Sequence, residues 1–94
     1  MCYDPRVIYF ARRLDTSEIK IGTTEHLERR MRELRSEAGP VEVLATMPGD
    51  RNEEQRLHQR FALFSTRGEW FVSSTSLLRY VQSLTMATNV NASR

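Results

Sequence analysis

The chain has 94 residues, of which 39% are hydrophobic and 28% are charged. This length is enough for one domain with one core, and it excludes a multidomain enzyme. The composition excludes a disordered chain, and no apolar stretch approaches the ~20 residues of a membrane span. The net charge of +2 is too small to identify a polyanionic partner by itself.

The basic residues are almost all arginine, and Lys20 is the only lysine. The planar arginine fork binds phosphate with two hydrogen bonds, but a GC-rich genome produces the same bias, so composition leaves both explanations open. Cys2 is the only cysteine, which excludes an intrachain disulfide and a zinc site built on cysteines. The first residues lack the apolar run of a secretory signal, so we expect an intracellular, cytoplasmic protein.

Two runs of β-branched and aromatic residues, 6–12 and 18–22, predict a β-hairpin with a polar turn between its strands. We predict a register in which Tyr9 lies opposite Lys20, so that these two side chains are neighbours on one face of the sheet. This register places four apolar side chains together on the other face, namely Ile8, Phe10, Ile19 and Ile21.

Apolar residues at helical spacing predict a helix from about 26 to 37, and its buried stripe consists of Leu27, Met31 and Leu34. On the helical wheel, Arg30 lies about 60° from the centre of this stripe, at the border of the buried face. Arg29 and Arg32 lie on the opposite, solvent-facing side. One arginine of this cluster is therefore expected to point toward the core.

The segment 41–47 reads as a third strand, and Asp50 opens a second helix after a turn. Glu53 stands three residues after Asp50 and completes a capping-box pattern, so it has a structural role. Glu54 has no such role. It lies at the edge of the buried side, one turn before His58.

A last helix is predicted after residue 74, with a buried stripe of Leu77, Val81 and Leu84. Residues 86–94 show no periodicity and are expected to form a flexible tail. We therefore predict a single α+β domain over residues 1–85, in which a three-stranded antiparallel sheet is flanked by three helices.

Several polar residues fall on the borders of apolar faces that must pack together. Each alone has an ordinary explanation, as a packed tyrosine, a solvated lysine or a helical Glu–His pair. Together they favour phosphodiester chemistry, in which a carboxylate holds a divalent metal, an arginine neutralises charge and a base activates water. The set consists of Tyr9, Lys20, Arg30, Glu54 and His58.

Five blocks, VIYF, IKIGTT, LERRMREL, EEQRLHQRF and GEWF, follow one another along residues 7 to about 84. In order and spacing they resemble the GIY-YIG nuclease superfamily, in particular its small phage-type branch. The resemblance implies that Tyr9 and Gly22 belong to the two named motifs, which form paired strands. It implies that Arg30 is the catalytic arginine and Glu54 the metal-binding glutamate. Three further residues match features typical of the branch and are expected to support the site: His58, Glu69 and Trp70.

Two positions depart from the superfamily pattern. Lys20 stands in the place of the tyrosine of the second motif, and Leu34 stands where several of these nucleases carry a histidine. Lysine at the first position is usual for the phage-type branch. With solvent access and Glu18 nearby, we expect Lys20 to be a cation that contacts phosphate.

The resemblance therefore implies a DNA endonuclease in which Glu54 holds one Mg²⁺ or Mn²⁺ ion. Arg30 and Lys20 would stabilise the transition state, and Tyr9, or with less weight His58, would orient or deprotonate the attacking water. Exposed arginines would contact the nucleic-acid backbone, namely Arg29, Arg32, Arg56 and Arg60.

Two other functions remain open at this point, a nucleic-acid-binding module that does not cleave and a protein-interaction domain. The sequence does not distinguish DNA from RNA, and it leaves the oligomeric state undetermined. We find no separate recognition domain in these 94 residues, and the sequence leaves open whether a partner protein or domain supplies sequence specificity. We expect no membrane partner.

Overall fold

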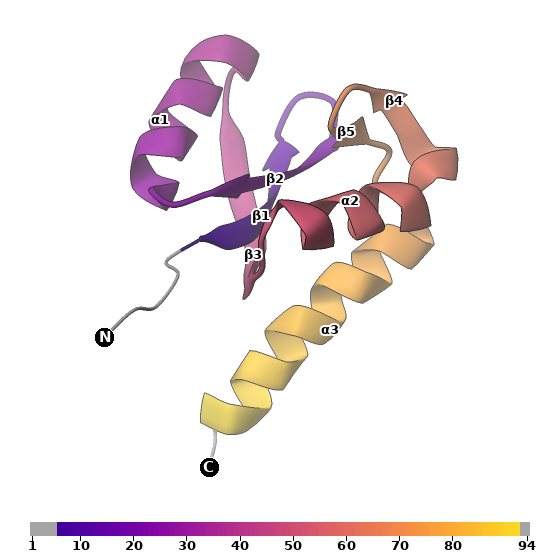
Figure 1. Ribbon diagram of the computed structural model, residues 1–94. Coiled ribbons are helices and arrows are strands. Elements are labelled where there is room, and N and C mark those ends of the chain that lie inside the picture. Colours follow the sequence, from indigo (N-terminus) through magenta and orange to yellow (C-terminus); the bar gives the residue numbers. More distant parts are fainter. Residues whose placement is uncertain (1–5, 93–94) are drawn as a thin grey trace.

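The computed structural model describes the backbone of residues 6–92 and the side chains of residues 6–85. The elements in chain order are β1 (Val7–Arg13), β2 (Ile19–Thr24), α1 (Leu27–Ala38), β3 (Val41–Pro48), α2 (Arg51–Arg60), the 3₁₀ helix η1 (Ala62–Phe64), β4 (Ser65–Arg67), β5 (Trp70–Phe71) and α3 (Thr75–Ala92). The strands form one antiparallel sheet in the order β3-β1-β2-β5-β4. Helix α1 covers one face, and α2 and α3 cover the other (Figure 1).

The predicted α+β class is confirmed, but the predicted number of strands is wrong. The sheet contains β4 and β5 in addition to the three expected strands. These two strands have three and two residues. Alternation of polar and apolar side chains needs about four residues to be recognised, so strands this short leave no periodic signal in the sequence.

The β1–β2 hairpin is confirmed, but its predicted register is wrong by two residues. Tyr9 pairs with Gly22, and Lys20 pairs with Ala11. A shift of two residues keeps every side chain on its predicted face, so the hydrophobic pattern does not distinguish the two registers. The turn selects between them, because Ser17 has a φ of 66° and the Arg13 N–H donates to the Glu18 carbonyl at 2.8 Å.

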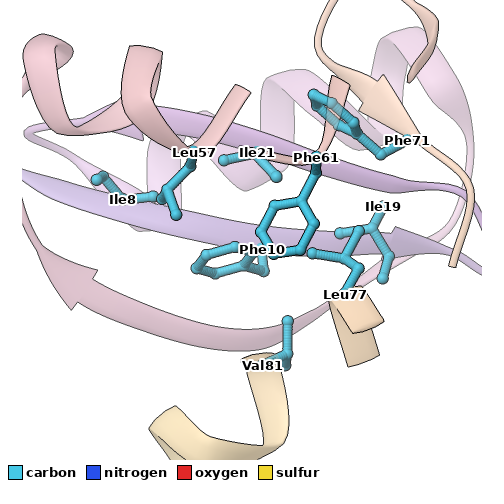
Figure 2. Close-up of a cluster of buried hydrophobic side chains, with 9 residues drawn as sticks. All are labelled: Ile8, Phe10, Ile19, Ile21, Leu57, Phe61, Phe71, Leu77 and Val81. Carbon is cyan, nitrogen blue, oxygen red and sulfur yellow. The ribbon is translucent and has the colours of Figure 1, made fainter. Parts of the chain in front are cut away.

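The apolar face predicted for the hairpin lies in the main core, between the sheet and helices α2 and α3. Figure 2 shows these side chains directed toward one another, and the buried cluster consists of Ile8, Phe10, Ile19, Ile21, Leu57, Phe61, Phe71, Leu77 and Val81. A smaller cluster lies under α1 and consists of Tyr9, Ala11, Met31, Leu34, Val41 and Trp70. Tyr9 and Lys20 share this second face, as predicted.

Helix α2 begins as its sequence predicts. The Asp50 side chain accepts a hydrogen bond from the Glu53 backbone N–H at 3.1 Å. The Glu53 carboxylate pairs with Arg56 instead of completing the capping box. Helix α2 thereby acquires a fixed start, which also fixes the direction in which Glu54 points.

Helix α3 continues through most of the segment for which we expected a flexible tail. Its backbone is helical to Ala92, and no glycine or proline interrupts this stretch. Residues 93–94 of the expected tail lie outside the described residues, as does Cys2, and the mobility of the tail stays a prediction. None of the helices within residues 6–92 combines the length and apolarity that a membrane span requires.

Candidate functional site

The candidate site lies at the outer edge of β2, at the point where the pairing between β2 and β5 ends. Strand β5 pairs only with Ile19 and Lys20, so no strand of the described chain covers residues 22–24 on that side. At the junction, the Ile21 N–H donates to the Glu69 carbonyl at 3.1 Å. The Ile21 carbonyl accepts a hydrogen bond from His58 Nε2 at 2.9 Å. Side chains from both faces of the sheet can therefore meet at this edge.

Gly22 allows the Tyr9 ring to cross β2. A Cβ atom at residue 22 would lie 2.6 Å from the Tyr9 hydroxyl oxygen and 2.8 Å from its Cζ. The Tyr9 side chain is only 1% exposed. Its hydroxyl accepts a hydrogen bond from Arg30 Nε at 3.2 Å. The glycine is thus required for close approach of the ring, and the ring in turn connects β1 to α1.

Substitution Gly22→Ala is expected to destabilise the fold by about 1–3 kcal/mol, because the buried Tyr9 ring has no room to retreat. Urea denaturation measures this loss. The double variant Gly22→Ala/Tyr9→Phe removes the nearest clashing atom and should recover part of the stability. Equal stability of Gly22→Ala and the wild type would contradict the described packing.

Burial raises the pKa of the Tyr9 phenol above its usual value. The hydrogen bond from Arg30 opposes this shift, whereas the negative charges of Glu69 and Glu54 add to it. The phenol is therefore protonated at neutral pH. Since its oxygen accepts from Arg30, its proton can be donated to a further oxygen, which suits an orienting role better than that of a base.

Arg30 lies half-buried at the border of α1, as the helical wheel predicts. Its guanidinium contacts Tyr9 through Nε and pairs through Nη1 with Glu33 at 3.2 Å and with Glu37 at 3.9 Å. The sequence analysis did not single out these glutamates, although each is one or two helical turns from Arg30. They hold the guanidinium against the phenol.

The expected surroundings of Lys20 require correction. The Lys20 ammonium pairs with Glu69 at 3.1 Å rather than with Glu18, and its side chain is 11% exposed. The Trp70 ring centroid lies 5.4 Å from this ammonium. The pairing of β5 with β2 places Glu69 and Trp70 beside Lys20. The residues next to Lys20 in the sequence do not indicate this contact, because it joins distant segments of the chain. Glu18 instead lies near Arg67.

Glu54 is the only buried charged residue of the described chain, with 5% of its surface exposed. Burial raises the pKa of its carboxyl group, and the charge of Glu69 raises it further, while His58, Arg51 and Lys20 act in the opposite direction. The distance from Glu54 Oε2 to His58 Nε2 is 3.8 Å. Among the described residues, no hydrogen bond to the Glu54 carboxylate is found.

These contacts assemble most of the predicted functional residues into one edge site, which consists of Tyr9, Lys20, Gly22, Arg30, Glu54, His58, Glu69 and Trp70. Strands β1, β2 and β5, helices α1 and α2, and the β4–β5 turn each contribute to it. Arg51 is an addition that the sequence analysis missed. Arg51 precedes Glu54 by three residues on α2, and residues at this spacing are neighbours on a helix, so the sequence could have predicted that Arg51 lies near Glu54.

The four exposed arginines lie outside the edge site. Arg29 and Arg32 line a shallow groove of about 320 Å³ at the start of α1. Arg56 is 71% exposed and pairs with Glu53. Arg60 lies over the Tyr80 ring, with 4.7 Å between its guanidinium carbon and the ring centroid. These arginines therefore surround the domain rather than forming one patch.

The donor set at the edge site fits a divalent ion only in combination with a substrate. No group of three or more His, Cys, Asp or Glu side chains that could hold a metal occurs among the described residues. Mg²⁺ is commonly bound by one or two carboxylates together with phosphate oxygens. The Glu54 carboxylate, which accepts no hydrogen bond from the described chain, is suited to be that protein ligand.

The fold and the edge site define a small α+β domain that gathers a phenol, cations and carboxylates at an open sheet edge. The T5orf172 domain family matches residues 6–85, and the chain belongs to this family. It is a phage-associated domain often linked to nuclease activity, and the chain is accordingly a phage-type nucleic-acid-binding or nuclease-like module. No curated protein and no solved structure matches the chain.

Proposed function

We propose that this domain is a GIY-YIG-type endonuclease that hydrolyses DNA phosphodiester bonds with the help of a divalent metal. The observation that carries the proposal is the environment of Glu54, a buried carboxylate without a hydrogen-bond donor, close to the charges of Lys20 and Glu69. Burying a carboxylate costs stability unless a cation or a donor compensates it. No fully buried side-chain oxygen or nitrogen of the described residues lacks a partner, so the Glu54 carboxylate oxygens keep some contact with solvent and a cation can reach them.

Glu54 would hold the Mg²⁺ or Mn²⁺ ion, with substrate phosphate oxygens as its other ligands. When bound, the ion supplies a positive charge next to the phosphate and favours ionisation of water. Arg30 adds a fixed guanidinium, which Tyr9 and Glu33 orient. Lys20 adds a second cation, whose carboxylate partner Glu69 limits its movement. Both side chains would stabilise the negative charge that develops on the phosphate.

The two groups expected to act on the attacking water, Tyr9 and His58, differ in their contacts. Tyr9 keeps its proton at neutral pH and would orient the water as a hydrogen-bond donor. His58 donates from Nε2 to the Ile21 carbonyl, so in its neutral form Nδ1 is the basic nitrogen. The nitrogen that lies 3.8 Å from Glu54 Oε2 is Nε2, which is already bonded to Ile21, so His58 would help to hold the site together, while Tyr9 and Arg30 would position the water and the phosphate.

Titration of supercoiled plasmid with the purified protein and Mg²⁺ or Mn²⁺ tests the proposal. We expect nicked and then linear DNA in the presence of metal, and unchanged plasmid in the presence of EDTA. A parallel reaction with structured RNA determines whether RNA is also a substrate. Absence of metal-dependent cleavage of either polymer would refute the nuclease proposal.

A nucleic-acid-binding module that does not cleave is the second candidate. The Lys20–Glu69 ion pair favours it, because a carboxylate that neutralises the lysine weakens its attraction for phosphate. The two candidates differ in one result. A binding module would retain DNA with EDTA and with Mg²⁺ equally, and it would leave the plasmid intact in both cases.

Both candidates predict binding that depends on salt. Arg29 and Arg32 are exposed and line the groove at the start of α1, so they can offer charge to a nucleic-acid backbone. In the double variant Arg29→Gln/Arg32→Gln, the slope of log K against log salt should decrease by about two, as expected for two lost phosphate contacts. Fluorescence anisotropy with a labelled duplex measures this slope, and an unchanged slope would exclude these arginines from the interface.

A further inference from the structure

We propose that a groove between the end of α2 and the beginning of α3 binds a backbone phosphate of a nucleic-acid strand, separately from the edge site. Helices α2 and α3 lie side by side on the same face of the sheet (Figure 1). The groove has a volume of about 520 Å³. It is lined by Arg60, Thr75, Ser76, Arg79, Tyr80 and Ser83.

The first argument is that the Arg60 guanidinium is held in place before any ligand binds. It lies over the Tyr80 ring at 4.7 Å and over the Phe61 ring at 5.4 Å. The Tyr80 ring is itself fixed, because it packs against Phe10 and Phe61 and its hydroxyl donates to Met47 Sδ at 3.6 Å. Stacking orients a guanidinium and leaves its N–H groups available at the edge, so less rotamer entropy is lost when a ligand binds.

The second argument concerns charge. Half of the arginines of the described chain pair with carboxylates, as Arg56 does with Glu53, and the other half do not. Neither Arg60 nor Arg79 pairs with a carboxylate among the described residues, and no acidic side chain lines the groove. Two guanidinium groups in one concave surface repel each other, and an anion relieves this repulsion. Phosphate is the anion whose oxygens match the arginine fork.

The hydroxyl groups that line the groove are expected to contribute less to phosphate binding than the two arginines do. Ser83 Oγ already donates to the Tyr80 carbonyl at 2.6 Å, and Ser76 Oγ lies 3.4 Å from Ser74 Oγ. Ser76, Arg79 and Ser83 follow one another at helical spacing, so they present one polar face of α3 to the groove. The two arginines therefore supply the binding, and the serines provide a polar wall without a charge.

The identity of the ligand as a nucleic-acid strand rests on the proposed function. Arg60 follows Glu54 by six residues on α2, which corresponds to about 9 Å along the helix axis. This is the rise of about three nucleotides along one strand of a duplex. Six residues also turn the helix by about 600°, so Arg60 lies about 120° around the α2 axis from Glu54. A strand that crosses the edge site and follows the surface of α2 around this angle can place a phosphate in the groove.

Fluorescence anisotropy with a labelled 20-base-pair DNA duplex, in EDTA so that no cleavage occurs, tests the groove. The double variant Arg60→Gln/Arg79→Gln should bind about tenfold more weakly, and its slope of log K against log salt should be lower by about two. Arg60→Lys keeps the charge but loses the stacked fork, so we expect an intermediate affinity. Arg35→Gln removes the same charge from α1, on the other face of the sheet, and should change affinity less than twofold. Circular dichroism checks that each variant is folded.

Three results would overturn the proposal. The first is a wild type that does not bind the duplex, and the second is a groove double variant that binds like Arg35→Gln. The third is displacement of the duplex by polyglutamate of equal charge as readily as by unlabelled DNA, which would identify a general acceptor of acidic proteins. If the groove binds millimolar inorganic phosphate while the groove variants bind the duplex as well as the wild type does, that outcome equals the second result and also overturns the proposal. Plasmid nicking is scored separately, so a protein that binds through the groove without cleaving refutes the nuclease proposal alone.

Discussion

Glu54→Gln is expected to lose metal-dependent cleavage by more than about 10²-fold, because the amide keeps the shape of the side chain but removes the only charged ligand proposed for the ion. Single-turnover nicking rates at saturating Mg²⁺ or Mn²⁺ measure this loss. Duplex binding in EDTA should be retained. A Glu54→Gln variant that cleaves like the wild type would exclude Glu54 as the metal ligand.

Glu53→Gln is the matched control, since it makes the same chemical change at the neighbouring position. The helix cap involves the backbone N–H of Glu53 rather than its carboxylate. The substitution therefore removes only the exposed pair with Arg56, which is worth at most about 1 kcal/mol. Its cleavage rate should stay close to that of the wild type.

The same Glu54 variant should be more stable than the wild type at neutral pH. Because burial raises the pKa of Glu54, the folded state binds this proton more tightly than the unfolded state does, and ionisation at higher pH costs stability. The cost is absent below the unfolded pKa of about 4.3 and complete above the raised folded pKa. Urea denaturation at neutral pH and at about pH 4 should show an advantage of Glu54→Gln that diminishes with acid. A variant that is less stable than the wild type at neutral pH would contradict this account.

Arg30→Ala is expected to lower the cleavage rate by about 10²- to 10³-fold, which corresponds to about 3–4 kcal/mol of lost transition-state stabilisation. Its guanidinium is already oriented by Tyr9 and Glu33, so no reorganisation is needed during the reaction. The measurement is again the single-turnover nicking rate, with duplex affinity recorded beside it. A loss of binding that equals the loss of rate would indicate a binding role instead.

Arg30→Lys separates charge from geometry. Lysine keeps the positive charge but has no group that corresponds to Nε at the Tyr9 hydroxyl, so we expect a rate between those of Arg30→Ala and the wild type. Tyr9→Phe removes the other half of this contact. If the contact serves to orient Arg30, then Arg30→Lys should lose less rate in the Tyr9→Phe background than in the wild type.

Much of the architecture could be predicted because it follows from periodicity. The alternation along β1 assigned Tyr9 and Phe10 to opposite faces, and the helical wheel placed Arg30 at the border of α1. The hairpin register could not be predicted in the same way. Two registers that differ by two residues bury the same side chains, and the deciding feature, Ser17 in the left-handed region, belongs to the turn.

The surroundings of Lys20 and Glu54 depend on contacts between distant segments. Strand β5 has two residues, so no pattern in the sequence shows that it pairs with β2 and brings Glu69 to Lys20. The burial of Glu54 was expected only at the edge of a helix face. Its full extent comes from the sheet edge against which α2 packs, and the raised pKa of the carboxyl group follows from that packing.

The shortness of β5 also determines which polymers can reach the edge site. Strand β2 has no paired strand beyond Lys20 on this side, so the described part of the chain places no strand as an outer wall next to the residues of the edge site. A long polymer can bind across such an edge at an internal position, because none of its ends has to pass through a tunnel. If the domain is a nuclease, as proposed, we therefore expect it to cut closed circular and linear DNA equally well.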